Sequence, residues 1–185
     1  MPRLKKEFKE QIKKLETSVL QEIVLKLAAK EKMVYEYILA NYLDKEGGEQ
    51  ILFEKTKSDL DFLFIKSYKG YSEQLRHTNM LAACIKRINE FTKISKNKVL
   101  EADLLVYVLK TSFSMPKEFF GTCFTTYDTK VALILKRLIN IVSNKLHEDY
   151  KIEYESKINN YLKKIHQTSN HIDTIYFMPQ KLSAE

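Results

Sequence analysis

The sequence predicts an all-α fold of about nine helices, arranged as an irregular bundle or a short α-solenoid. Apolar residues recur at three- and four-residue intervals in almost every window of the chain. Turn formers are scarce, because the 185 residues include only 4 Gly and 3 Pro. We therefore expect one helical domain over residues 1–167, followed by a weakly ordered C-terminal tail over residues 168–185.

The first half of the chain contains five predicted helices. Thr17 or Ser18 can cap the second helix, and Ser72 can cap the fifth. Gly70 fits the left-handed position that ends a helix. The pair Gly47-Gly48 marks the clearest break, since each glycine lowers helix propensity by ~1 kcal/mol relative to alanine. The five predicted helices span residues 3–16, 18–30, 32–43, 50–68 and 72–94.

The segment 99–110 is predicted to be the central helix. Its apolar residues point in every direction around the helix axis, so neighbours must cover it on all sides. A buried parallel strand would show the same run of Val and Leu, but no other segment offers strands to pair with. We expect the helices over 72–94 and 127–147 to wall it, because their apolar arcs are the widest. The first helix, with Ile12, is expected to have one covered face.

The second half of the chain contains three further predicted helices. Ser114 and Pro116 favour the start of a short helix that Gly121 would end. A strongly amphipathic helix follows over 127–147, and a charged helix over 149–167.

Two stretches carry helix-packing patterns. The first runs Leu4-Lys-Lys-Glu-Phe-Lys, Leu15, Leu20-Gln-Glu-Ile-Val-Leu-Lys-Leu and Val34-Tyr-Glu-Tyr-Ile, and the second Ile85-Lys-Arg-Ile-Asn-Glu-Phe and Glu101-Ala-Asp-Leu-Leu. Over about residues 4–113 the chain resembles an uncharacterised family of small all-helical bacterial proteins. The resemblance implies a helical fold and a bacterial source, and it implies no activity, cofactor or catalytic residue.

Charge, hydropathy and cysteine content limit the partners and the compartment that we expect for the protein. The net charge is +7, which permits a polyanion or an acidic protein as partner and also describes an ordinary solvated helical surface. No apolar stretch approaches the ~20 residues needed to span a bilayer, so no membrane partner is expected. Cys84 and Cys123 are the only cysteines, and a reducing cytoplasm is the expected compartment.

No metal or cofactor site is predicted. His166 and His171 are five residues apart, whereas side chains that meet on a helix are three or four apart. His77 and Cys84 share a helical face but are separated by ~10.5 Å of helix rise, which is too far for one ion. The sequence also lacks zinc-binding, phosphate-binding and dinucleotide-binding motifs.

Two residues are candidates for a reactive site. Asp103 is a carboxylate inside the apolar segment 99–110, and it is either a perturbed acid in a cleft or the partner of a helix end, a Lys or an Arg. Cys123 is either a reactive thiol or a buried one packed beside Phe120 and Phe124. The structural interpretation is favoured for both, and both thiols are expected to be buried.

Three functions therefore compete. The favoured one is a non-enzymatic helical protein-interaction module, whose partner is another protein or a second copy of the chain. An enzyme with a site near Cys123 or Asp103 is the least favoured. A nucleic-acid-binding protein is the second candidate, and it would use dispersed basic residues such as Lys86, Lys93, Lys130, Lys136 and Arg137.

Overall fold

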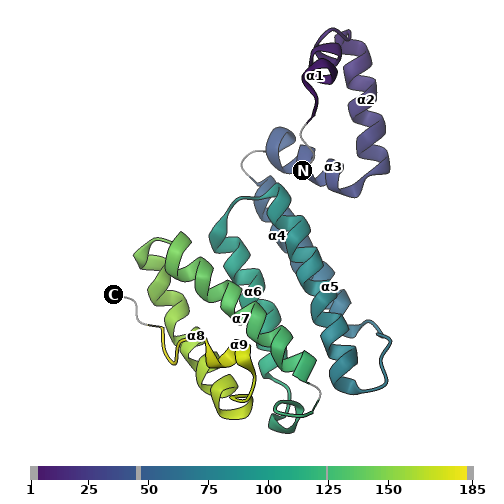
Figure 1. Cartoon of the computed structure of the whole chain (residues 1–185). Helices are drawn as coiled ribbons and strands as arrows, with labels where there is room; N and C mark the ends of the chain where they lie inside the picture. Colours follow the sequence, from purple (N-terminus) through teal and green to yellow (C-terminus); the bar gives the residue numbers. More distant parts are fainter. Residues whose placement is uncertain (1–3, 45–46, 124, 183–185) are drawn as a thin grey trace. The chain divides into compact units, whose positions relative to one another are not determined.

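A computed structural model of the chain describes residues 4–44, 47–123 and 125–182 and confirms the all-α fold within them. These residues form nine α-helices, one π-helical turn and one 3-10 turn, with no strand (Figure 1). The chain divides into two compact units, Met1–Glu49 and Gln50–Glu185, whereas the sequence predicted one domain over 1–167. The boundary falls directly after the glycine pair that the sequence identified as the clearest break. We call the two parts the N-terminal unit and the body.

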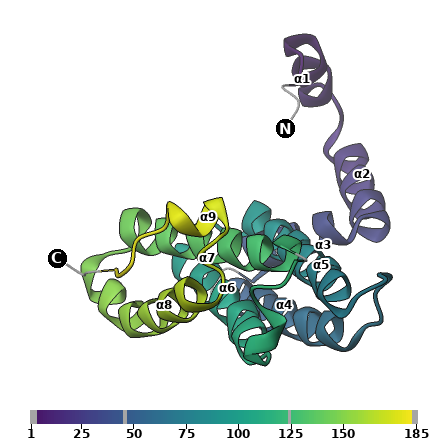
Figure 2. The same ribbon diagram turned by 60° about the horizontal axis from the view of Figure 1, so that its bottom comes forward.

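The N-terminal unit contains three helices and a π-helical turn. They are α1 (Lys6–Lys13), α2 (Thr17–Lys30), α3 (Lys32–Ile38) and the turn Leu39–Leu43. Helix α2 packs against α3, whereas α1 does not run alongside α2 (Figure 2). The unit therefore consists of short helices in sequence, with little opportunity to enclose a core.

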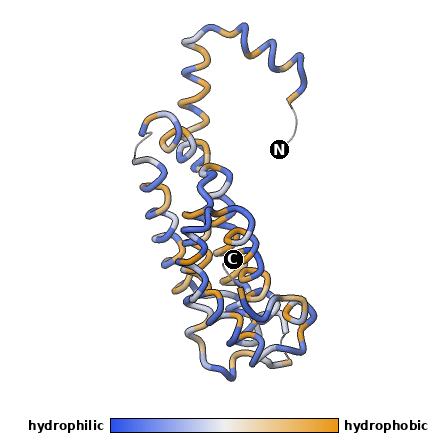
Figure 3. The backbone as a smooth tube through the Cα atoms, turned by 90° about the vertical axis from the view of Figure 1, so that its left-hand side faces the viewer, coloured by the Kyte–Doolittle hydropathy of each residue, from blue (hydrophilic) through white to orange (hydrophobic). Residues whose placement is uncertain are grey.

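None of the apolar side chains described in the N-terminal unit is buried. Fourteen large apolar or aromatic side chains between Leu4 and Leu43 are instead 37–74% exposed. The expected covered face of the first helix is absent, since Ile12 remains 37% exposed and α1 contains no buried residue. In Figure 3, apolar and polar residues alternate along the backbone of α1 and α2.

The body consists of six helices around a continuous apolar core. Helix α7 packs against four of the others, and the ribbons of α6, α7 and α8 lie next to one another in Figures 1 and 2. The core includes fully buried Leu60, Leu81, Leu105, Leu135 and Ile158, one from each of the five long helices. The helices are α4 (Gly48–Ile65), α5 (Glu73–Ile94), α6 (Lys98–Phe113), α7 (Thr125–Lys145), α8 (Glu148–Thr168) and α9 (Asp173–Tyr176).

Helix α6 contains the segment predicted to be central. It packs against α5 and α7 as expected, and Leu104, Leu105 and Val108 are fully buried. Helix α7 shares the central position, because α5 and α8 also pack against it. The remaining side of α6 faces α4, where the Tyr107 ring lies 5.8 Å from that of Phe64.

Side-chain caps start two of the core helices. The Ser72 hydroxyl accepts a hydrogen bond from the backbone N–H of Leu75 at 3.1 Å, as the sequence predicted. The Asn97 side-chain oxygen accepts from the backbone N–H groups of Val99 and Leu100 at 3.0 and 3.3 Å. These caps satisfy N–H groups that have no partner within their own helices.

Three local predictions of caps and helix ends were wrong. Helix α2 has Glu16 at its N-cap and no side-chain cap hydrogen bond, so neither Thr17 nor Ser18 caps it. Gly70 does not adopt the left-handed conformation, since α4 ends at Ile65 and Gly121 is the positive-φ glycine of the described residues. Gly70 instead allows close approach to α5, because an added Cβ would lie 3.0 Å from the backbone nitrogen of Arg76. Ser114 ends α6 rather than starting the next helix, and the predicted helix over 114–121 is reduced to a 3-10 turn, Lys117–Phe119.

The predicted weakly ordered tail is packed onto the body along its described part, residues 168–182. Ile172, Ile175 and Met178 recur every third residue and are all buried, and α9 packs against α7. The Asn159 side chain in α8 fixes the end of this segment by bonding both the backbone N–H and the carbonyl of Leu182. Three regularly spaced apolar residues and the Asn159 hydrogen bonds thus hold this segment on the body.

Candidate functional site

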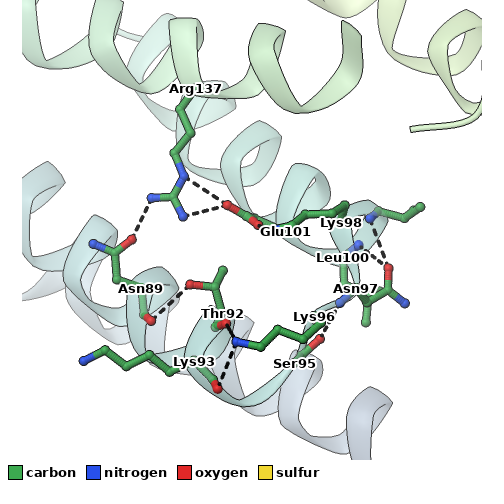
Figure 4. Close-up of polar contacts among 11 residues, drawn as sticks. Asn89, Thr92, Lys93, Ser95, Lys96, Asn97, Lys98, Leu100, Glu101 and Arg137 are labelled. Carbon is green, nitrogen blue, oxygen red and sulfur yellow. Dashed lines mark hydrogen bonds and ion pairs between the residues drawn. The ribbon is translucent and has the colours of Figure 1, made fainter. Parts of the chain in front are cut away.

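A polar network joins α5, α6 and α7 at Glu101, as Figure 4 shows. The Arg137 guanidinium donates to one Glu101 carboxylate oxygen, with N···O distances of 3.1 and 2.7 Å from Nε and Nη2. The ammonium group of Lys98 donates to the other oxygen of Glu101. Arg137 Nη1 also donates to the side-chain oxygen of Asn89 at 2.7 Å. Both carboxylate oxygens are therefore engaged by cations.

The electrostatics of Glu101 indicate a structural role. Burial raises the pKa of this carboxyl, but the hydrogen bonds from Lys98 and Arg137 outweigh burial and hold the pKa below its usual value. Glu101 is thus an ionised, paired carboxylate that links α6 to α7, and Arg137 extends the network to α5 through Asn89. A group with both oxygens occupied by cations is poorly placed to accept a proton from a substrate.

Asp103 is hydrogen bonded, although its partner differs from those expected. The hydroxyl of Tyr154 in α8 donates to Asp103 Oδ1 at 2.7 Å. Burial, followed by the nearby Asp103 carboxylate, raises the pKa of Tyr154 above its usual value. The sequence predicted a helix end, a Lys or an Arg as the partner, and that prediction was wrong because Tyr154 reaches Asp103 from 51 residues away.

The two cysteines lie in opposite environments. Cys84 is fully buried in α5 as predicted, and burial raises the pKa of its thiol to about 12. Cys123 is exposed, which corrects the prediction that both thiols are buried. The prediction placed Cys123 between Phe120 and Phe124, and Phe124 lies outside the described residues. The loop that follows Gly121 turns the thiol toward solvent instead.

Thiol labelling should separate the two cysteines. We expect Cys123 in the folded protein to react with an aromatic disulfide reagent roughly 100-fold faster than Cys84, whose reaction requires opening of α5. Stopped-flow absorbance of the released aromatic thiolate measures both reactions, as a fast phase from Cys123 and a slow phase from Cys84. Cys123→Ser should remove the fast phase and leave the slow one. A fast phase that persists in Cys123→Ser would contradict this assignment.

Asp128 is a buried carboxylate in the first turn of α7 that the sequence analysis did not single out. Its Oδ2 accepts a hydrogen bond from the backbone N–H of Gly121 at 2.7 Å. Burial raises the pKa of Asp128, and this effect outweighs the Gly121 N–H and the Ser169 hydroxyl, which both lower the pKa. Asp128 therefore anchors the loop before α7 next to the end of α8. An acid near a helix start, seven residues after a glycine, was the only sequence signal.

The five basic residues proposed for nucleic-acid binding lie on more than one helical face. Lys86 and Lys93 are exposed on α5 and are seven residues apart, so they share a face. Lys130 and Lys136 are six residues apart on α7, which places them on different faces. Arg137 is held by Glu101 and Asn89.

Two cavities in the body are small. The first has a volume of about 180 Å³ and is lined in part by Lys66, Arg76 and His77, and the second has about 100 Å³ between Phe113 and Lys164. Sites for small molecules usually have ~300–1,000 Å³. The described residues contain no group of three His, Cys, Asp or Glu side chains that could hold a metal ion. No described helix is long and apolar enough to cross a membrane.

Fourteen of the exposed large apolar side chains lie on the N-terminal unit. One helical face of α2 forms an open depression of about 450 Å³, lined by Thr17, Leu20, Gln21, Val24 and Leu25. We call it the α2 groove. We call the exposed apolar side chains of residues 4–27 the N-terminal apolar surface: Leu4, Phe8, Ile12, Leu15, Val19, Ile23, Val24, Leu25 and Leu27.

Comparisons of the chain with protein-family models, with curated proteins and with solved structures gave no match. The resemblance to a bacterial helical family thus remains an expectation. Among the described residues, the N-terminal apolar surface is the feature that the fold does not account for.

Proposed function

We propose that the chain is a helical protein-interaction module whose N-terminal unit docks on a protein. The observation that carries the proposal is the exposure of the N-terminal apolar surface in a unit with no buried apolar side chain among its described residues. Exposed apolar surface is costly in water, and monomeric proteins seldom expose contiguous patches of more than a few hundred Å². A chain that retains such a surface gains stability when a partner covers it.

The shape of this surface favours a helical partner. The α2 groove is lined at positions i, i+3, i+4, i+7 and i+8, which is the spacing of one helical face. An apolar groove of this kind accepts the apolar face of an amphipathic helix. Charged residues such as Glu22 and Lys26 flank the groove and form an exposed ion pair on the same helix. A polar rim around an apolar centre is the usual organisation of a protein–protein interface.

The alternatives have less support from the side chains. Asp103 is hydrogen bonded to Tyr154, and Cys123 is an exposed thiol. The nucleic-acid alternative depends on basic residues on several faces, and one of them, Arg137, is paired with Glu101. An electrostatic groove for a polyanion needs cations that are free to replace counterions.

Photo-cross-linking in the native cell tests the proposal. An aromatic-ketone amino acid is placed at Phe8, which is 48% exposed on the N-terminal apolar surface, and as a control at Phe62, which is 64% exposed on α4 of the body. We expect protein adducts from position 8 that are absent from position 62. Adducts from position 8 that disappear after nuclease treatment would favour nucleic acid, and an absence of adducts there would contradict the interaction function.

A further inference from the structure

We propose that the N-terminal apolar surface is covered by the same surface of a second copy of the chain, so that the protein is a homodimer joined through its N-terminal units. The inference rests on the proposed function and specifies the partner. It places α2 of one copy in the α2 groove of the other, in a twofold-symmetric pairing. Three properties of residues 1–49 support this choice.

The first property is that the N-terminal unit contains none of the usual means of stabilising a small domain. A unit of this length rarely has enough core to fold alone, and small proteins compensate with disulfides, a bound metal or oligomerisation. Residues 1–49 contain no Cys and no His, so neither a disulfide nor a zinc site of thiolates and imidazoles can form there. Oligomerisation is the remaining route, and an identical chain is always present at equal concentration.

The second property is the size of the exposed apolar surface. A fully buried aliphatic side chain removes on the order of 100 Å² of apolar area from water. The nine side chains of the N-terminal apolar surface, close to half exposed each, therefore offer roughly 400 Å² of apolar area per copy. A stable interface buries about 800 Å² on each partner, of which a little over half is apolar. The exposed surface is thus of the size that a dimer needs.

The third property is the distribution of charge along the unit. Residues 1–32 contain nine Lys or Arg against five Glu, whereas residues 33–49 contain one Lys against four Asp or Glu. The whole unit is close to neutral, with ten basic and nine acidic residues, so two copies do not repel strongly. Residues 4–27, which carry the N-terminal apolar surface, contain six Lys and four Glu, so a twofold pairing of this surface can place Lys side chains of each copy beside Glu side chains of the other.

Sedimentation of the full-length chain over a range of concentrations tests this inference. We expect the wild-type protein to sediment at twice the monomer mass at high concentration and to dissociate on dilution. Val24→Asp puts a charge into the α2 groove, where dimerisation would bury it, and should weaken the dimer about tenfold or more. Val24 is 45% exposed within the chain, so this change leaves the fold of the monomer intact.

Ile152→Asp is the matched control. Ile152 is an apolar residue on α8 of the body and is 67% exposed, so the same substitution there should leave sedimentation unchanged. Circular dichroism of both variants checks that the helices are retained. A wild-type monomer at every concentration, or a Val24→Asp dimer as strong as the wild type, would overturn the homodimer.

The cross-linker at position 8 separates failure of the homodimer from failure of the interaction function. An adduct of twice the chain mass supports the homodimer. An adduct with a different protein, together with a monomeric wild type, overturns the homodimer and leaves the interaction function standing. A cross-link from position 8 to residues 50–185 of the same chain, or no cross-link at all, overturns both.

Discussion

Leu105→Ala is expected to lower the free energy of unfolding of the body by about 2–5 kcal/mol. Leu105 is fully buried on α6, between the helices α5 and α7 that pack against it. Removal of its isobutyl group leaves a cavity that rigid neighbours fill only in part, so both the transfer free energy and the packing contacts are lost. That loss is a large share of a typical total stability of ~5–15 kcal/mol. Urea unfolding followed by circular dichroism measures it.

Ile12→Ala is the comparison, and it should lower the free energy of unfolding by less than about 1 kcal/mol at low protein concentration. Ile12 is 37% exposed on α1, and alanine has the higher intrinsic helix propensity. Leu105→Met, which nearly conserves volume, should recover most of the stability that alanine removes. A smaller effect for Leu105→Ala than for Ile12→Ala would mean that α6 is not a core helix.

Gly121→Ala is expected to destabilise the body by about 2–4 kcal/mol through backbone strain and overpacking. Gly121 has a φ of 68°, a left-handed conformation that alanine adopts only at a cost. An added Cβ would also lie 2.4 Å from the carbonyl oxygen of Thr168 at the end of α8, and a backbone atom cannot rotate away. The change would therefore disturb the loop that Asp128 anchors.

Thermal unfolding of Gly121→Ala beside Gly47→Ala provides the measurement and its control. At Gly47 the three atoms nearest to an added Cβ belong to the side chain of Asp44, the first at 3.1 Å, and that side chain can move. We expect a lowered melting temperature for Gly121→Ala and a change of less than about 1 kcal/mol for Gly47→Ala. Equal effects of the two substitutions would show that the contact of Gly121 with α8 contributes nothing to stability.

Local patterns in the sequence were sufficient to predict most helices of the body. Met80, Cys84, Ile88 and Phe91 recur on one face of α5, and all four are buried. The cap at Ser72 was equally readable, because a capping hydroxyl acts on N–H groups two or three residues away. Caps and helical periodicity depend on residues that are close in the sequence, so they can be predicted without knowledge of the tertiary structure.

The same periodicity could not tell what covers an apolar face. Leu4, Phe8 and Ile12 follow the pattern of a core-facing helix, yet all three are exposed. An apolar face on a helix indicates only that this face is buried in the functional state. The residues that bury it can belong to the same chain or to another. The partner of Asp103 was predicted wrongly for a related reason. Tyr154 is brought to Asp103 only by the packing of α8 against the rest of the body. The exposure of Cys123 depended on the course of one loop.

The order of the helices in the body has a kinetic consequence. Helices α5, α6, α7 and α8 follow one another in the chain, and each packs against the next. Only residues 95–97 separate α5 from α6, and only residues 146–147 separate α7 from α8. Closing such short loops costs little chain entropy, and chains dominated by local contacts cross their folding barrier in microseconds to milliseconds. The body can therefore form its core quickly after it is synthesised, and it spends little time as a collapsed intermediate with apolar residues open to aggregation.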